Sequence, residues 1–289
     1  MMAAEIPVID LSAPAFSTAN LIRQACVEHG CFYIVNHGVE EELVARVFEQ
    51  SKQFFSLPLD HKMKLLHKEH RGYTPGSIGR SIESFYIGNL QQTSLNQWPS
   101  QEVLPSWRST MESYYCKALS AGRRLISLIA LALNLDEDYF EKIGALNGPE
   151  AEAEAYIRLL HYYPGEMGHS KETKFGAHSD YGMITLLVSN GVPGLQVCRE
   201  NFKEPQIWED VLPLKGAFFV NIGKMIERWT NGMFRATLHR VVLTGQERYS
   251  LAFFVDPSPD CIVECLESCC SESCLKRFPP IRSGDYINR

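Results

Sequence analysis

Short apolar runs separated by turn-forming residues fill the second half of the chain, and this pattern constrains the fold more than any other feature of the sequence. After Gly148 the runs are rich in β-branched and aromatic residues, and Gly, Pro and Asn stand between them. Many short strands divided by turns are typical of an antiparallel sandwich or barrel, and not of alternating strands and helices. The predicted strands span residues 156–163, 183–188, 195–198, 217–222, 237–243 and 249–255.

The first half of the chain has a different periodicity. Apolar residues recur there at helical spacing, which predicts amphipathic helices. A short apolar and aromatic run at residues 31–35 predicts one strand between the first two helices. We therefore expect a mainly β fold with flanking helices. The predicted helices span residues 19–27, 40–55 and 107–135.

We expect the chain of 289 residues to form one compact unit, because it contains no internal repeat or low-complexity tract. Residues 1–110 are expected to form an N-terminal region of helices and a strand. Residues 111–289 are expected to form a long support helix followed by the β core.

The charge balance argues against two classes of partner. Lys and Arg total 28 against 34 Asp and Glu, which gives a net charge of −6, so the surface repels phosphate backbones and anionic lipids. No apolar run is long enough to cross a bilayer, and the sequence starts without a basic or apolar leader. We expect a cytoplasmic monomer that binds neither nucleic acid nor membrane.

The nine cysteines are an odd number in a long chain, which favours reduced thiols over a disulfide framework. Five of them gather near the C-terminus without a C-x2-C pair, so dispersed thiols are a better interpretation than a zinc site. These five are Cys261, Cys265, Cys269, Cys270 and Cys274.

Three residues have the types and the spacing of a metal site. His178 and Asp180 are two residues apart, so both side chains point the same way on an extended chain, and His239 follows in another predicted strand. Two imidazoles and one carboxylate are the ligand set of non-haem Fe(II) oxygenases. The alternative for His239 is a hydrogen-bonded structural histidine. His67 and His70 also have helical i, i+3 spacing, but their Lys-rich surroundings favour a solvated helix end.

Arg248 and Ser250 form the only Arg-x-Ser sequence in the chain. They share a strand face by the same two-residue period, so a guanidinium and a hydroxyl can bind one carboxylate there. The alternative for Arg248 is a solvated arginine at a strand edge.

These residues, with the segments around them, resemble the isopenicillin-N-synthase-like family of plant and fungal 2-oxoglutarate- and Fe(II)-dependent dioxygenases. The resemblance covers nearly the whole chain and implies a double-stranded β-helix, or jelly roll. It also implies that iron is bound by His178, Asp180 and His239. The resembling segments are residues 6–10, 30–38, 56–58, 159–164, 176–182, 193–197, 216–223, 238–241 and 248–250.

The resemblance further implies the cosubstrate and the reaction. Arg248 and Ser250 are expected to bind the distal carboxylate of 2-oxoglutarate, with the hydroxyl of Tyr163 in support. The implied enzyme uses O2 to oxidise a small-molecule metabolite, with succinate and CO2 as coproducts and ascorbate as a reductant in vitro. Hydroxylation is the expected outcome, and oxidative demethylation, desaturation and ring closure stay open. Two alternatives stay open: an iron-dependent oxidase of this fold that does not use 2-oxoglutarate, and a catalytically silent binding protein that retains the barrel.

Three aromatic residues are expected to contact the substrate. Phe254 lies four residues after Ser250 on the same strand face, where relatives place an aromatic residue against the substrate; the alternative is a core phenylalanine. Tyr73 and Tyr86 stand in a stretch predicted to be rich in loops, within segments that resemble substrate-facing parts of the family. Loop packing is the alternative for both.

The sequence departs from the family pattern at three places. His161 stands where many relatives have Asn, so it is either a supporting hydrogen-bond donor or a packed residue. Lys224 stands where relatives commonly have Asp, which affects a local salt bridge or a surface turn. The sequence also stops at Arg289, where many relatives continue into a helix near the mouth of the active site.

Overall fold

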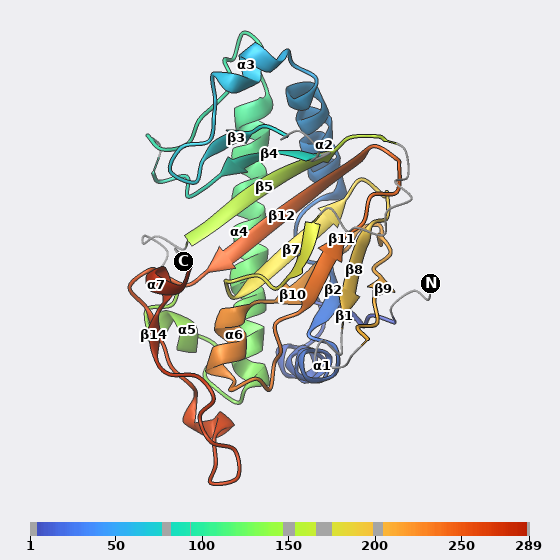
Figure 1. Cartoon of the computed structure of the whole chain (residues 1–289). Coiled ribbons are helices and arrows are strands. Elements are labelled where there is room, and N and C mark those ends of the chain that lie inside the picture. The colour runs from blue at the N-terminus through green and yellow to red at the C-terminus, as the bar shows by residue number, and fades with distance from the viewer. Residues whose placement is uncertain are drawn as a thin grey trace.

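Two β-sheets form the centre of the molecule (Figure 1). The computed structural model describes residues 5–76, 82–92, 94–146, 154–165, 175–198 and 205–287. Among these residues the large sheet consists, in spatial order, of β1 (Val8–Asp10), β2 (Cys31–Val35), β10 (Phe218–Ile222), β7 (Ile184–Ser189), β12 (Arg248–Asp256), β5 (Glu154–Tyr162), β4 (Ile82–Ile87) and β3 (Gly72–Thr74). The small sheet consists of β6 (Phe175–His178), β11 (Leu238–Val241), β8 (Leu195–Cys198) and β9 (Glu209–Asp210).

The two sheets pack against each other through apolar side chains. Leu195 and Val197 of β8 lie in one buried cluster with Tyr33 of β2 and Phe219 of β10. This arrangement is the predicted mainly β fold with a jelly-roll core.

Helices cover the outer face of the large sheet (Figure 1). α1 (Ala15–Glu28) and α2 (Glu41–Phe55) both pack against α4 (Trp107–Ala132), the long support helix expected from the sequence. α1 begins four residues before its predicted start. Its first three residues are exposed, Phe16 included, so this part of the sequence shows no apolar stripe that would predict a helix. The remaining elements are short: α3 (Leu59–Met63), α5 (Tyr139–Lys142), α6 (Lys224–Trp229), β13 (Ile262–Val263), η1 (Glu267–Cys269), β14 (Ile281–Arg282) and α7 (Ser283–Ile287).

Within the described part of the chain, no helix is both long and apolar enough to span a membrane. The cytoplasmic location stays a prediction.

The strands β3 and β4 correct one sequence prediction. The stretch expected to be rich in loops contains these two strands, which pair with each other and extend the large sheet beyond β5. β4 is buried on both faces, so its sequence lacks the alternation of apolar and polar residues that marks a half-exposed strand. Its one charged residue, Glu83, is only 1 % exposed, whereas an acidic residue in a sequence suggests a surface position.

Side chains alternate along β12, and this alternation gives the large sheet two different faces. Leu251, Phe253 and Val255 point toward the helices and join the apolar core. The intervening residues point into the space between the sheets, where Ala252 and Phe254 form a second cluster with side chains of β4, β5 and β7. β5 and β7 flank β12 in antiparallel register, so the same alternation continues on both sides. The inner residues of β12 begin with Arg248 and Ser250.

Phe54 lies at the centre of an aromatic cluster on the outer side of the large sheet. Its ring is fully buried and meets the ring of Phe85 edge-on, with the centroids 4.8 Å apart. Tyr73 and Trp107 lie at 5.9 and 5.6 Å from the same ring. The cluster therefore joins α2 and α4 to the end of the sheet that β3 and β4 form.

We expect Phe54→Ala to lower the free energy of unfolding by about 3 to 5 kcal/mol, because it leaves a cavity among rigid rings. Urea unfolding followed by fluorescence measures this loss. Phe16→Ala is the matched control: its ring is 76 % exposed, so the same substitution should change stability by less than about 0.5 kcal/mol. Equal losses in the two variants would contradict the assignment of Phe54 to the core.

Candidate metal and cosubstrate site

The structure brings His178, Asp180 and His239 together at one end of the two sheets. His178 ends β6, and His239 is its antiparallel partner in β11. The Nε2 atoms of His178 and His239 lie 3.8 and 3.7 Å from Oδ1 of Asp180, and all three ligand atoms fall within 4.8 Å of one another. Among the described residues this is the one group of three His, Cys, Asp or Glu side chains with such spacing.

Backbone carbonyls fix the orientation of both imidazoles. Nδ1 of His178 is 3.1 Å from the carbonyl oxygen of Gly176, and Nδ1 of His239 is 3.1 Å from that of Thr237. A carbonyl oxygen only accepts, so each Nδ1–H donates and each Nε2 keeps a lone pair that faces Asp180. Partial desolvation, and after it the neighbouring His239, lower the pKa of His178 and favour its neutral form.

The two carboxylate oxygens of Asp180 have different surroundings. Oδ2 accepts hydrogen bonds from the Thr185 hydroxyl at 2.6 Å and the Asn221 amide at 2.8 Å, which leaves Oδ1 toward the two imidazoles. Burial alone would raise the pKa of Asp180, but His239 and the two hydrogen bonds outweigh it and hold the pKa below its usual range. The side chain is thus an oriented carboxylate with one oxygen available as a ligand.

Backbone hydrogen bonds attach the segment around Asp180 to the start of α6. The amides of Lys224 and Met225 donate to the carbonyls of Asp180 and Gly182 at 2.9 and 3.0 Å. A Cβ at Gly223 would lie 2.2 Å from the Gly182 carbonyl oxygen, so this close approach requires glycine. Lys224 itself pairs with Glu227 at 2.8 Å, within the first turn of α6.

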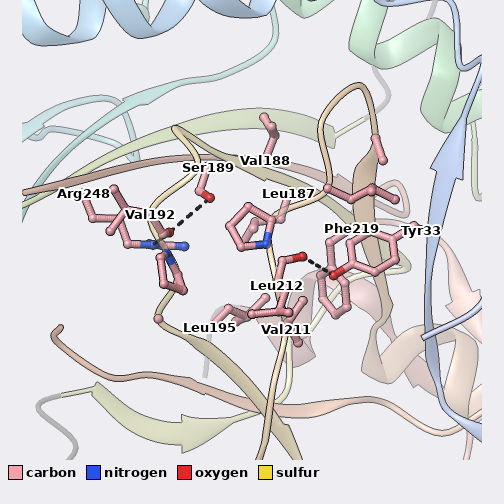
Figure 2. A pocket seen from close by; sticks show the side chains of 15 residues that line it. Tyr33, Leu187, Val188, Ser189, Val192, Leu195, Val211, Leu212, Phe219 and Arg248 are labelled. Atoms are coloured by element: carbon pink, nitrogen blue, oxygen red, sulfur yellow. Dashed lines mark hydrogen bonds between the residues drawn. The ribbon is translucent and has the colours of Figure 1, made fainter. Parts of the chain in front are cut away.

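Arg248 and Ser250 lie on the inner face of β12 and are 4 % and 3 % exposed. Nε of Arg248 donates to the carbonyl of Val192 at 3.2 Å, and a cavity of about 30 Å³ borders the guanidinium (Figure 2). Nη1 of Arg248 and Oγ of Ser250 are both buried without a hydrogen-bond partner among the described residues. Two buried donors without partners, one of them charged, match the oxygens of a carboxylate.

The tyrosine beside Arg248 is Tyr162 and not Tyr163. Tyr162 is the register partner of Arg248, whose guanidinium lies 4.8 Å from the centroid of its ring. Tyr163 is one residue further, and its ring lies 4.6 Å from that of His161, which pairs with the outward-facing Tyr249. The structure therefore does not bring Tyr163 to the cosubstrate residues. The two-residue period of β5, counted from the strand that carries Arg248, is the signal that could have identified Tyr162.

Two of the three expected substrate residues face the inside of the barrel. Phe254 stacks on Tyr156 with centroids 4.6 Å apart and an interplanar angle of 17°, and the ring of Tyr86 lies 6.5 Å from Tyr156. Tyr73 pairs with Phe85 on the outer face and is 1 % exposed, so the structure does not place it beside the other two.

His161 lies in a buried network of charges on the outer face. Its Nδ1 and Nε2 are 2.8 and 2.9 Å from carboxylate oxygens of Glu83 and Glu247. Glu83 also pairs with Lys62 at 2.7 Å and accepts a hydrogen bond from Tyr73. Burial alone would raise the pKa of Glu83, but the hydrogen bonds from His161, Lys62 and Tyr73 lower it to about 2. His161 therefore links Glu83 of β4 to Glu247, the residue directly before β12, on the face of the large sheet opposite the candidate site.

The nine cysteines, all within the described residues, are free thiols. The five near the C-terminus do not form a metal-binding group by the spacing that identifies the His178 site.

Comparisons with known proteins identify the family. A model of the 2OG-Fe(II) oxygenase superfamily matches residues 155–257, and a model described as non-haem dioxygenase in morphine synthesis N-terminal matches residues 6–101. Kihadalactone A synthase LFS of Citrus sinensis is 40 % identical over 98 % of this chain and 92 % of the relative. The chain belongs to the 2OG-Fe(II) oxygenase superfamily. Azadirone synthase LFS of Melia azedarach is also 40 % identical, over 96 % of this chain and 90 % of the relative.

Solved structures support the same assignment for this dioxygenase. A full-length Neurospora crassa protein, solved in complex with alpha-KG, superposes with a TM-score of 0.86 at 27 % identity, over 98 % of this chain and 94 % of that one. JOX2 in complex with 2OG, Fe and JA has a TM-score of 0.84 at 29 % identity, over 98 % of this chain and 84 % of that one. The protein is a non-haem dioxygenase that depends on Fe(II) and 2-oxoglutarate. The comparisons thus favour this function over the two alternatives that the sequence leaves open.

The charge network around His161 leads to a test of stability. Glu83 ionises near pH 4.5 in the unfolded chain and near pH 2 in the folded one, so its stabilisation is complete above about pH 4.5 and is lost as the pH falls toward 2. We expect Glu83→Gln to lower the free energy of unfolding by about 3 kcal/mol at pH 6. The variant should also lose less stability than the wild type between pH 5 and pH 3.

Urea unfolding at a series of pH values measures both effects. Glu112→Gln is the matched control, because Glu112 forms a largely exposed i, i+4 pair with Arg108 at 2.8 Å and such pairs contribute less than about 1 kcal/mol. A Glu83→Gln variant with the pH dependence of the wild type would contradict an ionised, buried Glu83.

Proposed function

We propose that this dioxygenase hydroxylates a small organic molecule, with 2-oxoglutarate and O2 as cosubstrates and succinate and CO2 as coproducts. In this reaction one oxygen atom of O2 enters succinate and the other enters the substrate hydroxyl. The observation that carries the proposal is the combination of three converging ligand atoms with a buried Arg248 and Ser250 whose donors lack partners among the described residues. A silent binding protein would not need both features.

The residues present fit a divalent iron and a keto diacid. His178, Asp180 and His239 would hold the metal through two neutral Nε2 atoms and one carboxylate oxygen, a set that leaves coordination positions for other ligands. Bound there, Fe(II) would activate O2, whose four-electron reduction draws two electrons from the oxidative decarboxylation of 2-oxoglutarate and two from a substrate C–H bond. Arg248 and Ser250 would bind the distal carboxylate of 2-oxoglutarate and so fix the position of its keto acid end.

The chain's own residues would control orientation. Thr185 and Asn221 hold the carboxylate of Asp180 in place. Phe254 and Tyr86 lie on the inner face on either side of Tyr156 and would pack against the substrate. The relatives are named for different small molecules, among them kihadalactone A, azadirone and JA. We therefore propose a small-molecule metabolite without naming one.

We also propose the organisation expected from the sequence. Residues 1–110 supply helices, the strands β1 to β4 and the first turn of the support helix α4, and residues 111–289 supply the rest of this helix and the catalytic core. The dioxygenase is proposed to act as a monomer in the cytoplasm, with ascorbate as a reductant in vitro.

We expect His178→Ala, Asp180→Ala and His239→Ala each to abolish the formation of succinate from 2-oxoglutarate, because two protein ligands do not hold the iron in a defined geometry. Mass spectrometry of succinate after incubation with Fe(II), ascorbate and a metabolite extract measures this. His61→Ala is the control, because the side chain of His61 is 42 % exposed. Turnover at the wild-type level in any of the three variants would contradict the ligand assignment.

We expect Arg248→Met to weaken the binding of 2-oxoglutarate by about 2 to 5 kcal/mol, or roughly thirtyfold and more, because it removes one partner of a desolvated charge pair. Calorimetric titration of the Mn(II)-loaded protein without O2 gives the Kd. Arg108→Met, which changes an exposed arginine on α4, should leave the Kd unchanged. An unchanged Kd in Arg248→Met would remove Arg248 from the cosubstrate site.

A further inference from the structure

Arg158 is a charged residue on the inner face of β5 to which the reaction described above gives no role. Its register partners are Tyr86 of β4 on one side and Ala252 of β12 on the other. The guanidinium carbon lies 5.1 Å from the centroid of the Tyr86 ring. Ala252 has only a methyl side chain, so it adds little bulk beside the arginine on this face.

Residues that pair across neighbouring strands form rows on the inner face of the large sheet. The row that contains Arg158 lies between a row near the metal ligands and a row that includes the cosubstrate residue Ser250. On the metal side the inner-face row consists of Thr185, Phe254 and Tyr156, and Thr185 holds Asp180. On the other side the next row includes Ser250. Successive residues on one face of a strand are about 7 Å apart, so Arg158 starts within one side-chain length of both rows.

The charge of Arg158 has no acidic partner among the described residues. Within that part of the chain the arginine forms no ion pair and no side-chain hydrogen bond, and its Nε is buried without a partner. The stacking on Tyr86 offsets part of the cost of desolvating the charge but leaves the buried Nε–H unsatisfied. Arg240, by contrast, lies over Trp208 and also donates to Gln196 at 2.8 Å.

We propose that Arg158 binds an acceptor oxygen of the substrate, either a carboxylate or a carbonyl, while the rings of Tyr86, Tyr156 and Phe254 pack against the apolar part of the same molecule. This inference rests on the proposed function and makes Arg158 a residue that determines specificity. A guanidinium presents a planar fork of donors, so it favours a two-oxygen or carbonyl group over a cationic or purely apolar one. The aromatic rings on either side favour a flat or ring-containing body.

The test compares three probes of similar size: 3-phenylpropanoate, 4-phenyl-2-butanone and 3-phenylpropylamine. Their binding is measured by ligand-observed NMR to the full chain loaded with Zn(II) and saturated with 2-oxoglutarate, so that a carboxylate probe does not report on Arg248. The wild type should bind at least one acceptor probe roughly tenfold or more tightly than the amine, the size of a charge-assisted hydrogen bond. The carboxylate and ketone arms distinguish an anionic from a neutral acceptor.

Arg158→Met keeps the apolar stem and should abolish this preference, whereas Arg158→Lys should retain part of the preference for the carboxylate and lose that for the ketone. Arg108→Met is the matched control, because Arg108 also lies over an aromatic ring, Trp98, at 5.0 Å but on the surface. It should retain the wild-type preference. Thermal unfolding of each variant shows that the chain is folded, and the lysine variant tests the inference if the methionine variant does not fold.

Equal binding of the three probes by the wild type, no binding of either acceptor up to its solubility limit, or a preference that survives in Arg158→Met would each overturn the inference. A variant that loses stability and keeps the preference would make Arg158 a structural residue. Binding of 2-oxoglutarate is recorded first in every sample. If the wild type does not bind it, the proposed function fails; if it binds and the acceptor preference is missing, the role of Arg158 alone fails.

Discussion

The alternation of side chains across β12 is the constraint on which the rest of the structure depends. Leu251 and Phe253 fix the strand to the helices behind it, while Arg248, Ser250 and Phe254 face the space between the sheets. The residues that stabilise the fold and those that do the chemistry are therefore interleaved in one strand. A shift of the pairing by one residue would turn the cosubstrate arginine toward the helices and an apolar side chain toward the metal. The antiparallel pairing with β5 and β7 prevents this shift.

Charges buried behind the sheet reinforce the same register. Glu247 and Arg248 are neighbours that point to opposite faces, one to His161 and one to the carbonyl of Val192. A buried ion pair returns in attraction about what it costs in desolvation, but removal of one partner leaves the other charge buried and unpaired, so the loss expected for Glu83→Gln reflects Lys62 left without its carboxylate. The partners in this network come from separate elements, and only the native pairing of β4, β5 and β12 brings them within hydrogen-bond distance.

The sequence predicts the ligand residues well because two-residue spacing is a local property of an extended chain. His178 with Asp180, and Arg248 with Ser250, can be recognised in this way without knowledge of the fold. Residues whose roles depend on which strands are neighbours are harder to assign. Arg158 is one of them, since nothing in its own segment shows that it faces inward, away from the acidic side chains of the described residues. β4 is not predicted from the sequence for two reasons. A strand buried on both faces has no alternation of apolar and polar residues, and Glu83 forms its ion pair with Lys62, which is distant in the sequence.

The two carboxylate oxygens of Asp180 have different roles, and this difference bears on which metal ion the site binds. The three donor atoms are oriented by hydrogen bonds to carbonyls, a hydroxyl and an amide, so the protein itself sets the ligand types and their directions. Such a nitrogen and oxygen set binds copper, nickel and zinc more tightly than ferrous iron. The metal ion that occupies the site would then depend on the relative concentrations of free metal ions around the enzyme. A competing ion would inhibit the activity by replacing Fe(II).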